Sequence, residues 1–320
     1  MKRLAPLFAL ALAVPAIAQE ETHCPPSPGE IVAAAPASEW RAIAPEDLLV
    51  MTLAPDARGE PREVVIQLMP PPFSQGWIDN IRTLSRAHWY DGISVVRVQD
   101  NYVAQWGDPN HDTPEATGPA KPLPGGLKVM GEGDYEADNP RENLLRTIVT
   151  ADDGWGSKDA YANHVGHSGG WPIGYSEVSW WPVHCYGMVG VGRSYSPDTG
   201  TGAELYTVIG HAPRHLDRNI ALVGRIVEGM EHLSSLPRGT GDLGFYLSEE
   251  ERVPILSIRV ASDLAEGERP RFEYLSTEGD TFAAYAEARA NRRDPFFIHP
   301  AGGADICNIP VPVRRVGEGG

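Results

Sequence analysis

Two neighbouring stretches decide how this sequence is interpreted: Trp89-Tyr90-Asp91-Gly92-Ile93-Ser94-Val95-Val96-Arg97-Val98 and Tyr102-Val103-Ala104-Gln105-Trp106-Gly107-Asp108-Pro109. Each contains a short run of apolar and β-branched residues, and the dipeptide Asp100-Asn101 separates them. This pattern predicts two antiparallel strands joined by a tight turn. Arg97 is the exception among the valines, because a charged side chain in an apolar strand needs a partner or a function. Gln105, eight residues later, would lie across the same hairpin.

Further predicted elements extend outward from this hairpin. Trp77, Ile81 and Leu84 recur at helical spacing and predict an amphipathic helix before it. Strands are predicted on both sides, at 48–54, 62–69, 187–193, 203–210, 221–227 and 253–260, with a second short helix at 229–236. This order favours a mainly β fold, a closed antiparallel β-barrel with two short capping helices. It argues against alternating parallel α/β units.

The remaining segments predict how the chain is organised around the barrel. We expect a Pro/Ala-rich leader at 19–46 that lies on the surface or stays mobile, and a barrel domain at 47–264. Within that domain, residues from about 110 to 185 form a long loop insertion in which only Glu142 to Val149 looks regular. A C-terminal extension at 265–320 contains one helical candidate, Thr281 to Arg292.

The first eighteen residues are typical of a signal peptide. Lys2-Arg3 precedes an apolar stretch, and Ala16-Ile17-Ala18 matches an A-x-A cleavage site. The alternative is an N-terminal membrane anchor, but the apolar run is too short to span a bilayer, and no other run approaches that length. We therefore expect an exported protein, periplasmic if the source has two membranes, that does not span a membrane.

Charge and composition exclude some classes of function. The formal net charge is −16, and cleavage after Ala18 would remove two positive charges and leave −18. Without a basic tract, nucleic acid is not expected as a partner, because phosphate contacts need clustered Lys and Arg. The 34 glycines and 29 prolines favour turns and short strands over long helices.

The three cysteines are Cys24, Cys185 and Cys307, and their spacing fits no zinc pattern. Export permits a disulfide, but an odd count leaves one thiol over. We favour a Cys185–Cys307 bridge because Cys24 lies in a Pro-rich tail. The sequence does not decide this.

The quoted hairpin resembles the "YDGxxFHRV…FMxQGGDP" segment of the cyclophilin family of peptidyl-prolyl cis-trans isomerases. Residues 202–206 are similar to "GSQFF", residues 216–217 with 223–230 are similar to "LDGKHVVFGKVxEGM", and residues 255–258 fit the closing strand. The resemblance covers roughly 48 to 262, apart from the insertion. It implies a cyclophilin-like barrel, isomerase activity without a cofactor, and proline-containing polypeptides as substrates.

Several family positions differ here. Val95-Val96 replace Phe-His before the arginine, Trp106 replaces the first paired glycine, and Ala203-Glu204 replace Ser-Gln. His215 stands where the family has a tryptophan, and Ile220 where it has a histidine. These changes retain the barrel and the arginine but alter the pocket.

The resemblance implies that Arg97 stabilises the twisted prolyl amide and that Gln105 holds the substrate backbone or orients Arg97. For Arg97 the alternative is a structural salt bridge, since charged strand residues are usually solvated or paired. The residues expected around the proline ring are Tyr102, Val103, Tyr206 and Leu216, with His215 at the rim. Each is also a plausible core or surface residue.

Other sites and functions were weighed against this one. His164 with His167, or His211 with His215, could be metal ligands, but nearby sequence completes neither set, so we expect no metal. The Gly-rich runs lack the context of a phosphate site. A rival hypothesis is a binding or chaperone module with little catalysis that recruits partners through the insertion. The oligomeric state is not predicted.

Overall fold

The computed structural model describes residues 25–111, 116–140 and 159–317. Its centre is a closed antiparallel barrel with the strand order β10-β11-β5-β4-β13-β2-β3-β12, closed by pairing of β10 with β12. The eight strands are β2 (Leu48–Leu53), β3 (Arg62–Leu68), β4 (Ser94–Val98), β5 (Val103–Gly107), β10 (Met188–Val191), β11 (Leu205–Val208), β12 (Leu222–Glu228) and β13 (Val253–Val260). The predicted mainly β barrel is therefore confirmed.

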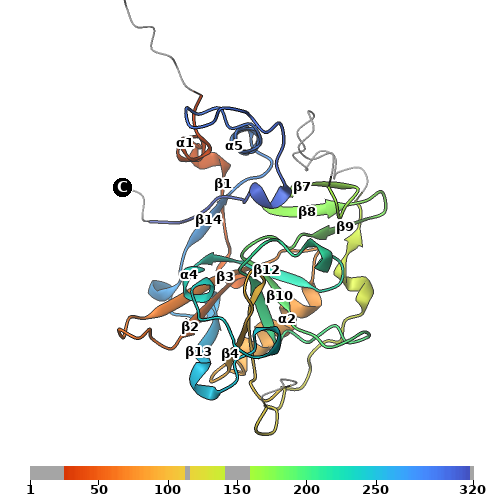
Figure 1. The fold of residues 1–320 in the computed structure, drawn as a ribbon, viewed down its shortest axis with the longest axis vertical. Coiled ribbons are helices and arrows are strands. Elements are labelled where there is room, and N and C mark those ends of the chain that lie inside the picture. The colour runs from red at the N-terminus through yellow and green to blue at the C-terminus, as the bar shows by residue number, and fades with distance from the viewer. Residues whose placement is uncertain (1–24, 112–115, 141–158, 318–320) are drawn as a thin grey trace, which may run out of the picture.

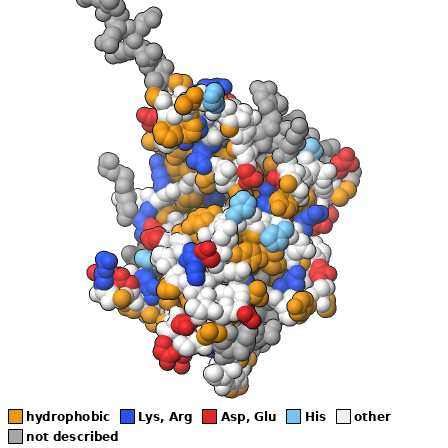
Figure 2. All heavy atoms as spheres, in the orientation of Figure 1, with side chains coloured by type: hydrophobic (Ala, Val, Ile, Leu, Met, Phe, Trp, Pro, Cys, Tyr) orange, Lys and Arg blue, Asp and Glu red, His pale blue; other side chains and the backbone are white. Residues whose placement is uncertain are grey.

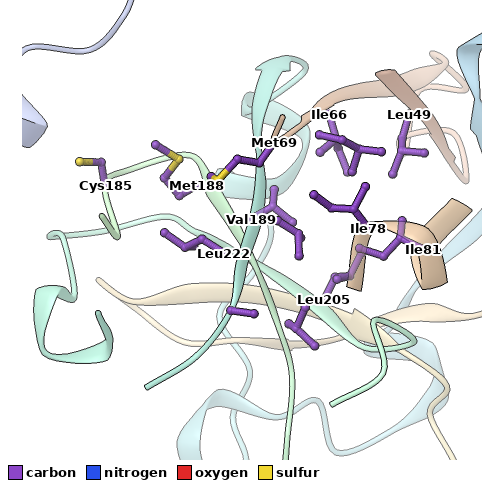
Figure 3. Packing of buried hydrophobic residues seen from close by; sticks show 14 of the residues in the cluster. Leu49, Ile66, Met69, Ile78, Ile81, Cys185, Met188, Val189, Leu205 and Leu222 are labelled. Atoms are coloured by element: carbon purple, nitrogen blue, oxygen red, sulfur yellow. The ribbon is translucent and has the colours of Figure 1, made fainter. Parts of the chain in front are cut away.

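Helix α2 (Gln75–Arg86) covers one end of the barrel, as its apolar spacing predicts. Trp77, Ile81 and Leu84 are all buried on this helix. In Figure 3, Ile78 and Ile81 point toward Leu49, Ile66 and Leu205 of the barrel strands. The second predicted short helix is α4 (Glu231–Ser234), after β12.

The insertion differs from the long loop that the sequence predicts. Its described part forms a four-stranded sheet in the order β6-β9-β8-β7. The strands are β6 (Ala137–Asp138), β7 (His164–Ser168), β8 (Trp171–Tyr175) and β9 (Ser179–Pro182). β8 and β9 contain proline, β7 is largely polar and β6 has only two residues, so none of them shows the apolar, β-branched run that predicts a strand. The expected regularity at 142–149 lies outside the described residues.

The predicted leader also needs correction where it is described. Residues 28–33 form α1 (Pro28–Ala33), and β1 (Trp40–Ala42) pairs with β14 (Phe272–Leu275) of the C-terminal extension. β14 also pairs with β15 (Val313–Arg315), and α1 packs beside α5 (Asp280–Ala290). The sequence did not reveal this because the pairing joins segments more than 200 residues apart.

The extension elements, with β1, α1 and the insertion sheet, form what we call the accessory layer, which lies above the barrel in Figure 1. It buries the outer face of β2 and β3. Leu49 and Met51 belong to the core inside the barrel, whereas Leu48 and Val50 pack with Phe272 in a second cluster. β2 is therefore apolar on both faces, because the accessory layer covers the face that solvent would otherwise contact.

A disulfide joins the accessory layer to the barrel. It connects Cys185, just before β10, to Cys307 in the 3₁₀ turn Ile306–Asn308. None of the helices in the described ranges combines the length and the hydrophobicity that a transmembrane segment requires.

Candidate active site

Arg97 is placed by an irregularity in the hairpin that it occupies. It lies on β4 opposite Gln105 of β5, and the pairing register shifts between Val95 and Arg97. Such an irregularity redirects a strand residue relative to its neighbours. Arg97 is half-buried, whereas the flanking Val96 and Val98 are buried.

Three hydrogen bonds fix the Arg97 guanidinium. Its Nε donates to the Leu243 carbonyl at 2.7 Å and its Nη1 to Gln105 Oε1 at 2.9 Å, while Nη2 donates to Gln99 Oε1. The rings of Tyr102 and Phe245 lie 5.6 and 5.4 Å from its Cζ. The guanidinium is therefore a fixed cation bounded by two aromatic rings.

Burial and neighbouring groups shift the pKa of the Arg97 guanidinium in opposite directions. Desolvation lowers the pKa of Arg97, and the nearby Tyr102 and Glu204 partly offset this decrease. An arginine remains protonated in proteins even so. Arg97 therefore keeps its charge at every physiological pH. The salt-bridge alternative has no support here, since no described carboxylate lies within ion-pair distance of Arg97.

Gln105 links Arg97 to Glu204, which stands where the family has glutamine. Gln105 Oε1 accepts from Arg97, and its Nε2 donates to Glu204 Oε1. A Cβ at Gly192 would lie 2.6 Å from Glu204 Oε1, so this glycine leaves room for the carboxylate. Both ends of the Gln105 amide are engaged, and the side chain is therefore held in place beside Arg97. The sequence identified Glu204 only as a departure from the family pattern.

A cavity of about 490 Å³ opens beside this chain of residues. Its lining includes Arg97, Gln105, Glu204, Phe245 and Tyr195. Tyr195 is 91% exposed, so its ring stands at the mouth. The volume falls within the range of about 300–1,000 Å³ typical of ligand pockets.

An apolar cluster lies next to Arg97. Val103, Tyr206 and Val208 are buried together, and the half-buried Tyr102 and Ile220 pack on them. The structure thus brings three of the predicted proline-contact residues together. Tyr206 is only 4% exposed, so it supports the cluster from beneath and presents little surface of its own.

Beneath the cluster lies a buried polar network that the sequence did not predict. The Tyr206 hydroxyl and His184 Nε2 are 2.9 Å apart, and His184 Nδ1 lies 2.9 Å from Asp217 Oδ1. Because a carboxylate only accepts, Nδ1 donates to Asp217, and in the neutral ring Nε2 accepts from Tyr206. Asp217 also accepts from buried Arg214, which pairs with Asp159. His184 lies at the end of the insertion, and only folding brings it to β11.

Leu216 and His215 lie in the 3₁₀ turn Arg214–Leu216 that this network anchors. Leu216 is half-buried and its neighbour Asp217 is part of the network, whereas His215 is exposed. None of the described hydrogen bonds or ring contacts joins the His215 side chain to Arg97 or Tyr206. Phe245, by contrast, was not predicted, because it lies in an irregular segment with no sequence motif.

The candidate metal ligands are separated by the fold. His164 is exposed on β7, while His167 is buried and donates from Nε2 to the Ile309 carbonyl at 2.9 Å. In the part of the chain that the structure describes, no group of three or more His, Cys, Asp or Glu side chains could hold a metal ion.

Comparison with protein families supports the interpretation of this geometry. The model of the cyclophilin-type peptidyl-prolyl cis-trans isomerase family matches residues 76–260, more than half of the chain. The chain belongs to the cyclophilin family. This cyclophilin is accordingly a peptidyl-prolyl cis-trans isomerase, and the matched region contains Arg97, Gln105, Glu204 and Tyr206.

The chain was also compared with solved structures. A cyclophilin from Hirschia baltica, AquaCyp293, is 24% identical, with a TM-score of 0.63 over 86% of this chain and 93% of that one. A cyclophilin-type isomerase of Cryptosporidium parvum is 12% identical, with a TM-score of 0.36 over 66% of this chain and 98% of that one. The bacterial structure therefore shares the fold over most of both chains. No curated protein matches this sequence.

Proposed function

We propose that this cyclophilin isomerises prolyl bonds of exported proteins and that Arg97 stabilises the transition state. The barrier, about 18–20 kcal/mol, arises because rotation breaks the resonance of the amide. In the twisted state the prolyl nitrogen regains a lone pair that accepts a hydrogen bond. A fixed guanidinium binds that state better than either planar isomer, and this difference in binding is the catalysis.

The observation that carries the proposal is how Arg97 is held. Gln105, Gln99 and the Leu243 carbonyl fix its three nitrogens, and the cation lines an accessible cavity beside an apolar cluster. A thousandfold acceleration requires about 4 kcal/mol, within reach of a charge-assisted donor together with apolar contacts. No covalent bond is made or broken, so the reaction needs no cofactor.

Other residues have supporting roles in this proposal. The exposed surface of Tyr102, with Ile220 and Leu216, contacts the prolyl ring, and Val103 and Tyr206 support that surface from beneath. Gln105 keeps Arg97 oriented through Glu204. His215, exposed on its turn, contacts substrate residues outside the prolyl ring.

Two features support export. The first eighteen residues have the pattern of a signal peptide, and the Cys185–Cys307 disulfide is of a kind that persists in oxidising compartments. N-terminal sequencing of the protein from its native source should give a start near Gln19. A retained Met1 would rule out the proposed export.

The catalytic proposal is tested by a coupled isomerisation assay on short X-Pro peptides. Arg97→Ala should lower kcat/KM about a hundredfold or more, since the guanidinium acts on the transition state. Arg97→Lys should restore little, because a point charge lacks the planar fork. Arg86→Ala, which removes an exposed arginine of α2, is the matched control and should retain full activity.

Two results would contradict the proposal. An Arg97→Ala variant with wild-type activity would remove Arg97 from the mechanism. An inactive wild-type protein that still binds proline peptides would favour the rival function, a binding or chaperone module that uses the insertion.

A further inference from the structure

A second cavity lies away from the active site, at the junction of the barrel and the accessory layer. Its volume is about 360 Å³. Met188 and Arg225 line the barrel side, and Ile309 and Val311 of the C-terminal segment line the other, with the Cys185–Cys307 disulfide at one end. Figure 2 shows hydrophobic and basic side chains together along this junction.

Arg225 is the charged group in the cavity wall and is only 8% exposed. Its Nε donates to Gln67 Oε1 at 2.9 Å and its Nη1 to the Gly170 carbonyl at 2.8 Å. The Trp171 ring lies 4.4 Å from its Cζ and covers one face of the guanidinium. Its Nη2, however, is buried without a hydrogen-bond partner.

The charge of Arg225 is also uncompensated. Among the described residues, no carboxylate lies within ion-pair distance of it; the nearby Glu228 and Glu273 pair with Arg315 and Arg314. Burial accordingly lowers the pKa of Arg225 to about 10, and the ring of Tyr274 is its nearby electrostatic support. A buried cation without a counter-charge is unfavourable unless an anion compensates it.

We infer that this cavity binds a small aliphatic carboxylate, with its head group on Arg225 and its chain along the apolar walls. Arg225 lines the cavity, and a carboxylate beside it would supply the missing counter-charge. One cation matches one negative charge, and the walls of Met188, Ile309 and Val311 suit an alkyl chain rather than a sugar or a nucleotide. The inference does not depend on isomerase activity, because the cavity shares no lining residue with the active-site cavity.

Calorimetric titration of the full-length protein with sodium octanoate tests the inference. Octanoate should bind saturably at one site per chain. Acetate, which has the charge without the chain, and 1-octanol, which has the chain without the charge, should each bind at least tenfold more weakly.

Variants separate the head-group contact from the cavity. Arg225→Gln should weaken octanoate binding at least tenfold, and Val311→Phe should do the same by filling the cavity while keeping the charge. Arg62→Gln, which removes another arginine of the barrel that donates to a carbonyl, is the control and should bind as the wild type does.

Three results would overturn the inference. Equal binding of octanol and octanoate would show an apolar cavity that ignores the charge. Wild-type affinity in a folded Arg225→Gln or Val311→Phe variant would place the ligand elsewhere. Absence of saturable octanoate binding at millimolar concentration would show that Arg225 stays buried without an anion. If Arg225→Gln does not unfold cooperatively, Val311→Phe decides the matter.

Discussion

Two arginines of the same barrel are held in nearly the same way and differ in what surrounds them. Arg97 donates to Gln105 and the Leu243 carbonyl between two aromatic rings, and Arg225 donates to Gln67 and the Gly170 carbonyl against Trp171 and Tyr274. Arg97 is half-buried at the active-site cavity, whereas the accessory layer covers Arg225.

If Arg97 acts as we propose, this difference means that the set of hydrogen-bonding and aromatic partners alone does not make an arginine catalytic. Glutamine, carbonyl and aromatic partners fix a guanidinium in both places, but a polypeptide can reach only the one at an open cavity. At the covered site the same preorganised cation is a structural contact and, by our inference, a receptor for a small anion. Access for the substrate therefore separates the two roles.

Stability measurements on alanine variants should distinguish the two sites most strongly. Arg225→Ala should lower the free energy of unfolding by about 2–4 kcal/mol, because Gln67 and the buried Gly170 carbonyl lose their donor. Arg97→Ala should lower it by less than about 1 kcal/mol, since solvent can replace its contacts. Urea denaturation measures both. An Arg225→Ala variant as stable as the wild type would mean that burial of the charge offsets its contacts.

The junction around Arg225 should also be sensitive to acid. Burial lowers the pKa of His167 to about 4, with Arg225 adding to the decrease and the hydrogen bond to the Ile309 carbonyl opposing it. Between pH 6.5 and 4 the unfolded state binds more protons, so stability falls as the pH falls. From pH 6.5 to 5 the loss should be about 1.5–2 kcal/mol.

Urea denaturation as a function of pH measures this loss. His167→Gln should remove most of it, while the exposed control His88→Gln should not. An unchanged slope in His167→Gln would assign the acid sensitivity to other groups.

The two glutamines offer a subtler test of the comparison. Gln105→Leu should lower kcat/KM about tenfold, equivalent to about 1.4 kcal/mol, because Arg97 loses its orientation. Gln67→Leu should change kcat/KM by less than about twofold. The isomerisation assay compares the two variants. An equal loss of kcat/KM in both would indicate that the Arg97 and Arg225 sites are coupled.

The smallest effect is expected beneath the active site. Tyr206→Phe keeps the ring but removes the hydroxyl that donates to His184, which should lower the free energy of unfolding by about 1 kcal/mol. Because the hydroxyl is bonded to His184 and not to Arg97, kcat/KM should stay within about threefold of the wild type. A tenfold loss of activity with unchanged stability would instead place the hydroxyl in the reaction.

Much of the fold could be predicted from local patterns. The turn dipeptides and apolar runs of 89–109 predicted β4 and β5, and the spacing of Trp77, Ile81 and Leu84 predicted α2. The insertion sheet could not be predicted this way, because proline in β8 and β9, polar residues in β7 and the two-residue length of β6 obscure the strand pattern. β1 was missed for another reason, since its partner β14 lies far along the chain.

The sequence by itself was enough to predict the barrel and to place Gln105 opposite Arg97. The contacts within a hairpin are local, and they follow from turns and strand patterns. Only the tertiary structure decided which side chains complete the site. Leu243, Phe245 and Glu204 reach Arg97 and Gln105 from segments about 100 to 150 residues away, and His184 reaches Tyr206 from the insertion. The tertiary structure likewise covers Arg225 and leaves Arg97 accessible, because burial depends on which distant segments pack over a strand.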